Sequence, residues 1–150
     1  MPRQKIKIIT DACCKVPNAH LPSPFLRKGH SACGVVIADE ENKIIGEHAK
    51  YLGELTISQA EYEGLIFGLD KGAEICRGEA EVWMDSEFIV RQMNGDYGVK
   101  SENMKPLYDK VKILERRYLK GIKYFHHPRE TELAKRADYL ANTEIKKHRT

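Results

Sequence analysis

The spacing of apolar side chains along the chain alternates between a period of two and a period near four, which separates strands from helices. Residues 5–11 alternate polar and apolar positions and then become apolar, which predicts a strand that enters the core and ends at Asp11. Residues 33–38 form an apolar run, and a polar turn at 39–42 separates them from a third strand at 43–52. We expect 33–52 to form a hairpin.

The pattern then changes to a mixture of helices and strands. Residues 57–76 place apolar and small side chains on one helical face, and Thr56 with Gln59 provides a capping box at its start. The remaining predicted elements are a strand at 80–85, helices at 86–94 and 103–119, a strand at 121–126 and a helix at 131–147. The order β-β-β-α-β-α-α-β-α predicts an α/β fold, a mixed five-stranded sheet with helices on both faces. Residues 1–150 contain no repeat or linker and are expected to form a single domain.

The segment 13–33 is predicted to be an irregular loop, because it contains three prolines. It also holds side chains of the types that bind zinc, although their spacing matches no standard zinc finger. These side chains are Cys13, Cys14, His20, His30 and Cys33. Free thiols near strand ends and exposed histidines are the favoured interpretation, and a structural metal is the alternative.

Composition places the chain among ordinary globular proteins. Its 150 residues are 41% hydrophobic and 31% charged, and no apolar stretch approaches the ~20 residues of a membrane span. The N-terminus has no apolar segment of the signal-peptide type, so we expect a cytoplasmic monomer with reduced cysteines rather than a secreted or membrane protein. Basic side chains predominate in residues 1–30 and 101–150, and acidic ones in 31–100. This charge distribution suits a nucleic-acid enzyme that uses bound cations, although a mixed solvated surface would also explain it.

Four acidic residues lie at positions where their carboxylates could act together. Asp11 and Asp85 end predicted strands, Glu61 lies one turn inside the first helix, and Asp138 lies in the last helix. If the first and fourth strands are neighbours, their carboxylates project from the same sheet edge, where they repel one another unless cations bind. Mg²⁺ is commonly held by carboxylates and substrate phosphates, and two such ions can promote phosphodiester hydrolysis.

Four segments in this order resemble ribonuclease H of type 1, and the stretch from Gln92 to Tyr108 looks like its compact bacterial and archaeal branch. The segments are Ile9-Thr-Asp11-Ala-Cys, Gln59-Ala-Glu61-Tyr-Glu-Gly-Leu, Val82-Trp-Met-Asp85-Ser86 and Arg136-Ala-Asp138-Tyr-Leu-Ala-Asn142. The resemblance extends over about residues 5–145. It implies the ribonuclease H-like fold and an endonuclease that cleaves the RNA strand of RNA–DNA hybrids, leaving 5′-phosphate and 3′-hydroxyl ends.

The resemblance also implies roles for individual residues. Asp11 would bridge two Mg²⁺ ions, for which Mn²⁺ could substitute. Glu61 and Asp85 would complete the ion on the leaving-group side, and Asp138 would hold the ion that activates water. A histidine before the last helix assists turnover in many members, and His126 and His127 are both candidates.

Substrate contacts are implied at Ala12, Thr56, Ser58 and Ser86. The chain departs from the family pattern near these positions, because Ala12 replaces a frequent Gly, Ile57 and Ser58 replace two Asn, and Glu87 replaces Gln. Asn18 is the candidate for an Asn that contacts nucleic acid in the family. Two alternatives therefore remain open: a nuclease of the same fold that acts on double-stranded RNA or structured DNA, and a non-catalytic nucleic-acid-binding or interaction module.

Overall fold

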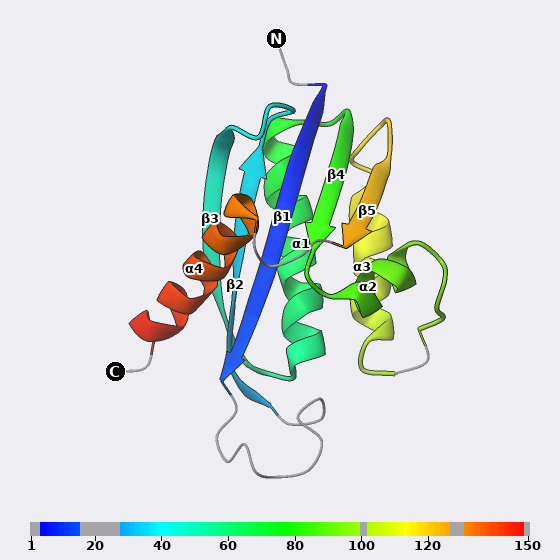
Figure 1. The fold of residues 1–150 in the computed structure, drawn as a ribbon. Helices are drawn as coiled ribbons and strands as arrows, with labels where there is room; N and C mark the ends of the chain where they lie inside the picture. The colour runs from blue at the N-terminus through cyan, green and yellow to red at the C-terminus, as the bar shows by residue number, and fades with distance from the viewer. Residues whose placement is uncertain (1–3, 16–27, 100–101, 127–130, 149–150) are drawn as a thin grey trace.

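A computed structural model describes residues 4–15, 28–99, 102–126 and 131–148. One five-stranded sheet in the order β3-β2-β1-β4-β5 forms its centre (Figure 1). The strands are β1 (Lys5–Lys15), β2 (Gly29–Ala38), β3 (Ile44–Leu55), β4 (Glu79–Met84) and β5 (Ile122–His126). The helices are α1 (Ile57–Ile75), α2 (Glu87–Met93), α3 (Lys105–Glu115) and α4 (Glu132–Lys147). None of the described helices is long and apolar enough to cross a membrane.

The sheet is mixed, as predicted. β1 pairs antiparallel with β2, and β2 with β3, so the hairpin expected from the sequence is confirmed. β4 lies parallel to both β1 and β5. Parallel strands need a crossover, and α1 supplies the one between β3 and β4. The sheet is open, with β3 and β5 at its two edges.

Helices cover both faces of the sheet, also as predicted. α1 lies behind the sheet in Figure 1 with α3 against it, while α4 crosses in front of β1, β2 and β3. β2, which lies between β3 and β1, is therefore buried along almost its whole length. The main core lies between the sheet and α1, where Tyr62, Leu65 and Leu69 are fully buried.

The predicted end of the first strand and the predicted start of the second strand were wrong, and both errors affect the site. β1 continues through Asp11 to Lys15, and β2 begins at Gly29, so 13–15 and 29–33 are strand and not irregular loop. The two segments pair with each other, from Asp11↔Gly34 to Lys15↔His30. Strand pairing is a tertiary contact, which the local polar pattern around Asp11 did not reveal. The candidate contact residue Asn18 and His20, which belongs to the alternative metal site, lie outside the described residues.

Two of the described thiols of this segment, Cys13 and Cys33, lie on opposite faces of the sheet. Cys13 packs with Ala141 and Ile145 of α4, whereas the backbone of Gly64 on α1 approaches Cys33 from the opposite face of the sheet. Burial raises the pKa of both thiols, to about 11 for Cys13 and about 12 for Cys33. Two thiols on opposite faces of the sheet cannot both reach one zinc ion, so Cys13 and Cys33 do not form a zinc site together.

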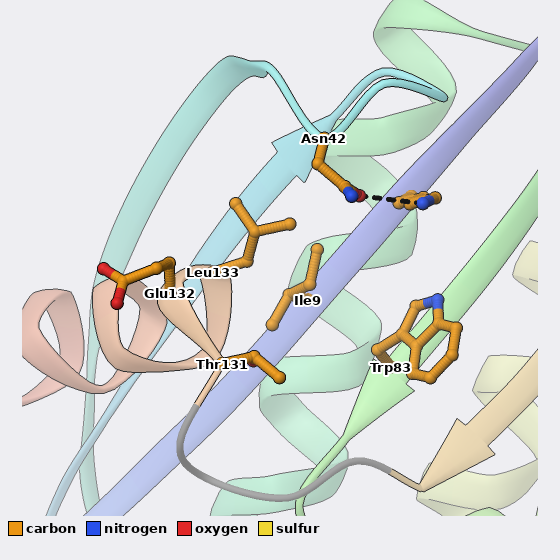
Figure 2. A pocket seen from close by; sticks show the side chains of 7 residues that line it. Ile9, Asn42, Trp83, Thr131, Glu132 and Leu133 are labelled. Atoms are coloured by element: carbon orange, nitrogen blue, oxygen red, sulfur yellow. Dashed lines mark hydrogen bonds between the residues drawn. The ribbon is translucent and has the colours of Figure 1, made fainter.

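Trp83, the single tryptophan of the chain, lies beside α4 on the face of the sheet that α4 covers. The Trp83 ring stacks on Phe125 of β5, with ring centroids 4.5 Å apart and an interplanar angle of 20°. Figure 2 shows Trp83 and Ile9 along a hollow that Leu133 of α4 borders on the other side. At one end of the hollow, Lys7 Nζ donates a hydrogen bond of 2.7 Å to Asn42 Oδ1. Trp83 therefore packs within this face.

Candidate active site

The candidate site lies at a step in the sheet, where β4 ends but the neighbouring strand β1 continues. β4 pairs with β1 only as far as Met84, which lies opposite Thr10, whereas β1 continues for five more residues. Asp11 is thus the first residue of β1 beyond the end of β4, and Asp85 is the first residue after β4. The sequence prediction that these two carboxylates share one edge is correct, although Asp11 lies within its strand and does not end it.

Helices bring the other two carboxylates to the step from opposite faces. Glu61 of α1 shares a small hollow with Asp11 and Asp85. The full lining of this hollow is Thr10, Asp11, Ala12, Glu61, Met84, Asp85 and Ser86. From the α4 side, the carboxyl group of Asp138 is hydrogen-bonded to that of Asp11. Four acidic side chains, from β1, α1, α4 and the connection after β4, therefore surround one end of β4.

The contact between Asp11 and Asp138 changes the protonation of Asp11. Burial, then the hydrogen bond and charge of Asp138, raise the pKa of Asp11 to about 7, with a smaller contribution from Asp85. The backbone N–H of Ala12 opposes this by donating a hydrogen bond of 2.9 Å to Asp11 Oδ1. Because two neighbouring carboxylates cannot both be ionised at low cost, Asp11 keeps its proton to a higher pH than an ordinary aspartic acid.

Two glycines allow the helices to come this close to β1. A Cβ on Gly34, the partner of Asp11 in β2, would lie 2.1 Å from the Ala137 carbonyl oxygen of α4. A Cβ on Gly64 of α1 would lie 3.1 Å from Cys33 Cβ and 3.8 Å from the Asp11 carbonyl oxygen. The missing side chain at Gly34 lets the backbone of α4 rest on the sheet beside Asp138.

The donor atoms of the site are of the kind that binds divalent cations. Among the described residues, no three His, Cys, Asp or Glu side chains already converge as a ligand set. The four acids nevertheless supply only hard oxygen donors, which suit Mg²⁺ and Mn²⁺. A cation would also replace the proton that holds Asp11 and Asp138 together, so the residues present fit a carboxylate-bound metal.

Comparison with known proteins assigns the family. Residues 26–144 match the family described as Reverse transcriptase-like. The solved structure of LC11-RNase H1 in complex with an RNA/DNA hybrid is 35% identical to the chain. It superimposes with a TM-score of 0.82, covering 97% of this chain and 99% of that one. The chain belongs to the ribonuclease H1 family. The predicted family and the predicted fold are both confirmed.

Two curated relatives are longer than the region that matches this chain. The Bifunctional protein Rv2228c of Mycobacterium tuberculosis is 35% identical over 108 residues, which are 72% of this chain and 29% of that protein. Ribonuclease HI of Halobacterium salinarum is 29% identical over 117 residues, which are 76% of this chain and 56% of that protein. The chain thus spans less than two thirds of the length of these ribonuclease H relatives.

The residues predicted to contact substrate fall into two groups. Ala12 and Ser86 line the hollow beside the acids. Thr56 and Ser58 lie at the start of α1 and are not part of that lining. The hydroxyl oxygens of Thr56 and Ser86 each accept a helix N–H, from Gln59 and Ile89, and the predicted capping box at Thr56 is confirmed.

Of the two predicted histidines, the structure describes one. His126 is exposed at the end of β5 and pairs with Met84, the residue before Asp85. His127 lies outside the described residues. The acidic replacement Glu87 lies in the first turn of α2 and forms an ion pair of 3.0 Å with Arg91, so part of its charge is compensated.

Two residues that shape the site, Gly34 and Asn142, are not predicted from the sequence. In the sequence, Gly34 is one glycine within an apolar run. Its close contact with α4 is seen only in the tertiary packing. Asn142 was seen as part of the last motif but was given no role, although its side-chain amide contacts Asp138. The spacing of four residues on a predicted helix could have indicated this contact.

Proposed function

We propose that the chain is a divalent-metal-dependent ribonuclease H that hydrolyses the RNA strand of RNA–DNA hybrids and leaves 5′-phosphate and 3′-hydroxyl ends. The observation that carries this proposal is the gathering of Asp11, Glu61, Asp85 and Asp138 at the step between β1 and β4. A binding module has no reason to hold four acidic side chains around a partly buried pair, because their repulsion disfavours the folded state.

In this proposal the four acids hold two Mg²⁺ or Mn²⁺ ions. Bound ions would supply an activated water and would stabilise the charge on the leaving oxygen during phosphodiester hydrolysis. Asp11, which touches Asp138 and shares a hollow with Glu61 and Asp85, is the side chain suited to bridge both ions. Glu61 and Asp85 would serve the leaving-group side, and Asp138 the water side.

The side chains around the acids would orient the substrate. Thr56 and Ser86 accept a hydrogen bond from the backbone, which leaves each hydroxyl hydrogen able to donate to a phosphate or a 2′-hydroxyl oxygen. We assign the same role to Ser58 and to the backbone at Ala12. A 2′-hydroxyl contact would distinguish RNA from DNA at the cleaved strand.

Two further side chains are placed to contact the nucleic acid beyond the hollow. Phe88 and Tyr97 are exposed aromatics whose ring centroids lie 5.7 Å apart, and Arg91 lies over the Tyr97 ring. Phe88 lies in α2, two residues after Ser86. We propose that this pair gives the bound strand an aromatic and cationic surface.

We assign proton transfer during turnover to His126 or His127. His126 lies level with the end of β4, and imidazole exchanges protons near neutral pH more readily than other side chains. We further propose that the protein acts in the cytoplasm as a monomer.

The decisive test is cleavage of an end-labelled RNA–DNA hybrid in Mg²⁺ and in chelator, with Asp85→Asn beside the wild type. We expect Mg²⁺-dependent loss of the RNA strand that the variant lacks. Double-stranded RNA, structured DNA and duplex DNA are the parallel substrates. Cleavage of one of these but not of the hybrid would contradict the assigned substrate, and hybrid binding without cleavage would favour a binding module.

A further inference from the structure

Asn142 follows Asp138 by one helical turn and makes two hydrogen bonds to it. The side-chain nitrogen Nδ2 donates to the Asp138 backbone oxygen at 2.9 Å and to the carboxylate oxygen Oδ1 at 3.0 Å. Asparagine is a poor helix former, because its amide competes with the backbone for hydrogen bonds. Asn142 nevertheless lies inside α4, five residues before the helix ends at Lys147.

The Asp138 carboxyl group is therefore held from two directions. Asn142 approaches it from the next turn of α4, and the Asp11 carboxyl group approaches it from β1. Asn142 is the neutral neighbour, and its amide nitrogen is a hydrogen-bond donor to the Asp138 carboxylate. Asp138 is exposed, so nothing else among its described contacts restricts its rotation.

We propose that Asn142 is a positioning residue that keeps the Asp138 carboxylate turned toward Asp11, and that it thereby sets the affinity of the site for divalent cations. The inference rests on the proposed function only in assigning Asp138 to a metal. Ligating carboxylates are commonly oriented by outer hydrogen bonds, and removing such a partner costs about 10–100-fold in metal affinity or activity.

The helix on which both residues lie is itself fixed to the sheet. Arg136 forms a two-pronged ion pair with Glu47 of β3, including an Nη2–Oε1 bond of 3.1 Å, and Ala137 rests on Gly34. With the backbone of Asp138 fixed in this way, the remaining freedom is the rotation of its side chain. That rotation is what the Asn142 amide restrains.

The experiment uses Asn142→Leu, which removes the donor but keeps a similar size and favours the helix. Asn142→Gln is the amide-retaining variant, since Gln and Asp four residues apart on a helix can still hydrogen-bond. Lys146→Ala, an exposed substitution on the same helix, is the control. Mg²⁺ is titrated into each full chain without nucleic acid, and the backbone amide signals of residues 11 and 138 are followed by NMR.

We expect the Mg²⁺ dissociation constant to rise about 10-fold in Asn142→Leu, and to stay within about threefold of wild type in Asn142→Gln and in Lys146→Ala. Hybrid cleavage by Asn142→Leu should then need more Mg²⁺, with kcat at saturating Mg²⁺ nearly unchanged. In an Asp138→Asn background, Asn142→Leu should have no further effect on Mg²⁺ binding.

An unchanged Mg²⁺ dissociation constant in folded Asn142→Leu would overturn the inference, and so would equal weakening in Lys146→Ala. The proposed function can fail separately. If wild type binds Mg²⁺ at residues 11 and 138 and Asn142→Leu weakens that binding, the positioning role holds even when neither protein cleaves the hybrid. If wild type cleaves the hybrid and Asn142→Leu has the same Mg²⁺ requirement, only the positioning role is lost.

Discussion

The two helices that deliver carboxylates to the site are attached to the sheet in opposite ways. α1, which carries Glu61, packs through large side chains such as Tyr62, Leu65 and Leu69 into the main core. α4, which carries Asp138, buries three alanines and one isoleucine. These are Ala134, Ala137, Ala141 and Ile145.

This difference indicates that stability and site geometry depend on different faces of the sheet: the α1 face stabilises the fold, and the α4 face sets the geometry of the site. Large apolar side chains contribute most of the burial energy, so the α1 face should dominate the free energy of unfolding. Alanines and Gly34 contribute little burial but allow the backbone of α4 to approach β1 closely. The α4 face should therefore control the position of Asp138 more than the stability of the fold.

Among substitutions outside the four acids, the largest expected effect on catalysis comes from adding a side chain at the α4 contact. Gly34→Val places a Cβ where the Ala137 carbonyl oxygen lies, so α4 must move away from the sheet and take Asp138 with it. We expect hybrid cleavage to fall by about 100-fold, since displacements near 1 Å cost that much in positioned reactions. Gly98→Ala, at an open position, is the control and should retain activity. Equal activity in Gly34→Val and wild type would contradict the proposed role of the close contact.

The largest expected effect on stability comes from the α1 face. Leu69→Ala removes a fully buried side chain from the main core and should lower the free energy of unfolding by about 2–5 kcal/mol in urea denaturation. Glu61 lies two turns away on the same helix, so the folded fraction should keep kcat within about twofold at 25 °C. A large loss of kcat with little loss of stability would reverse the contrast between the two helices.

A smaller, pH-dependent effect should come from Asp11. Its pKa is raised to about 7 by burial and by Asp138, against an ordinary value of 3.8. Between these values the folded state binds more protons than the unfolded state, so stability falls as pH rises from about 4 to 7. In chelator, Asp11→Asn should remove this loss and be more stable than wild type by on the order of 2 kcal/mol at pH 8. Urea denaturation at pH 4.5 and 8 measures this stability difference, and a difference that does not change with pH would refute the raised pKa of Asp11.

The smallest effect is expected from the ion pair that ties α4 to β3. Arg136→Gln removes the two-pronged contact with Glu47, which lies at the surface and is screened by salt. We expect a decrease of about twofold in cleavage rate at low ionic strength that disappears in 0.5 M salt. A decrease that is independent of salt would indicate a packing role for Arg136 instead.

The order of elements and the identity of the acids were accessible from the sequence, because both depend on local pattern and on motif resemblance. The extent of β1 and β2 was not, since pairing between residues 11–15 and 30–34 is a contact between distant segments. For the same reason the role of Gly34 could not be predicted, because it depends on a contact with the backbone of α4. Asn142 differs, because its four-residue spacing to Asp138 was readable from a predicted helix.

The central claim is that α1 and α4 complete one catalytic site from opposite faces of the sheet. The most direct test measures Mg²⁺-dependent hybrid cleavage by Glu61→Gln and Asp138→Asn, with Glu63→Gln as the matched control on α1. The account predicts that both site variants fold and lose at least about 1,000-fold in rate, while Glu63→Gln stays within about twofold of wild type. Near-normal cleavage by either Glu61→Gln or Asp138→Asn, or an equal loss in Glu63→Gln, would contradict it.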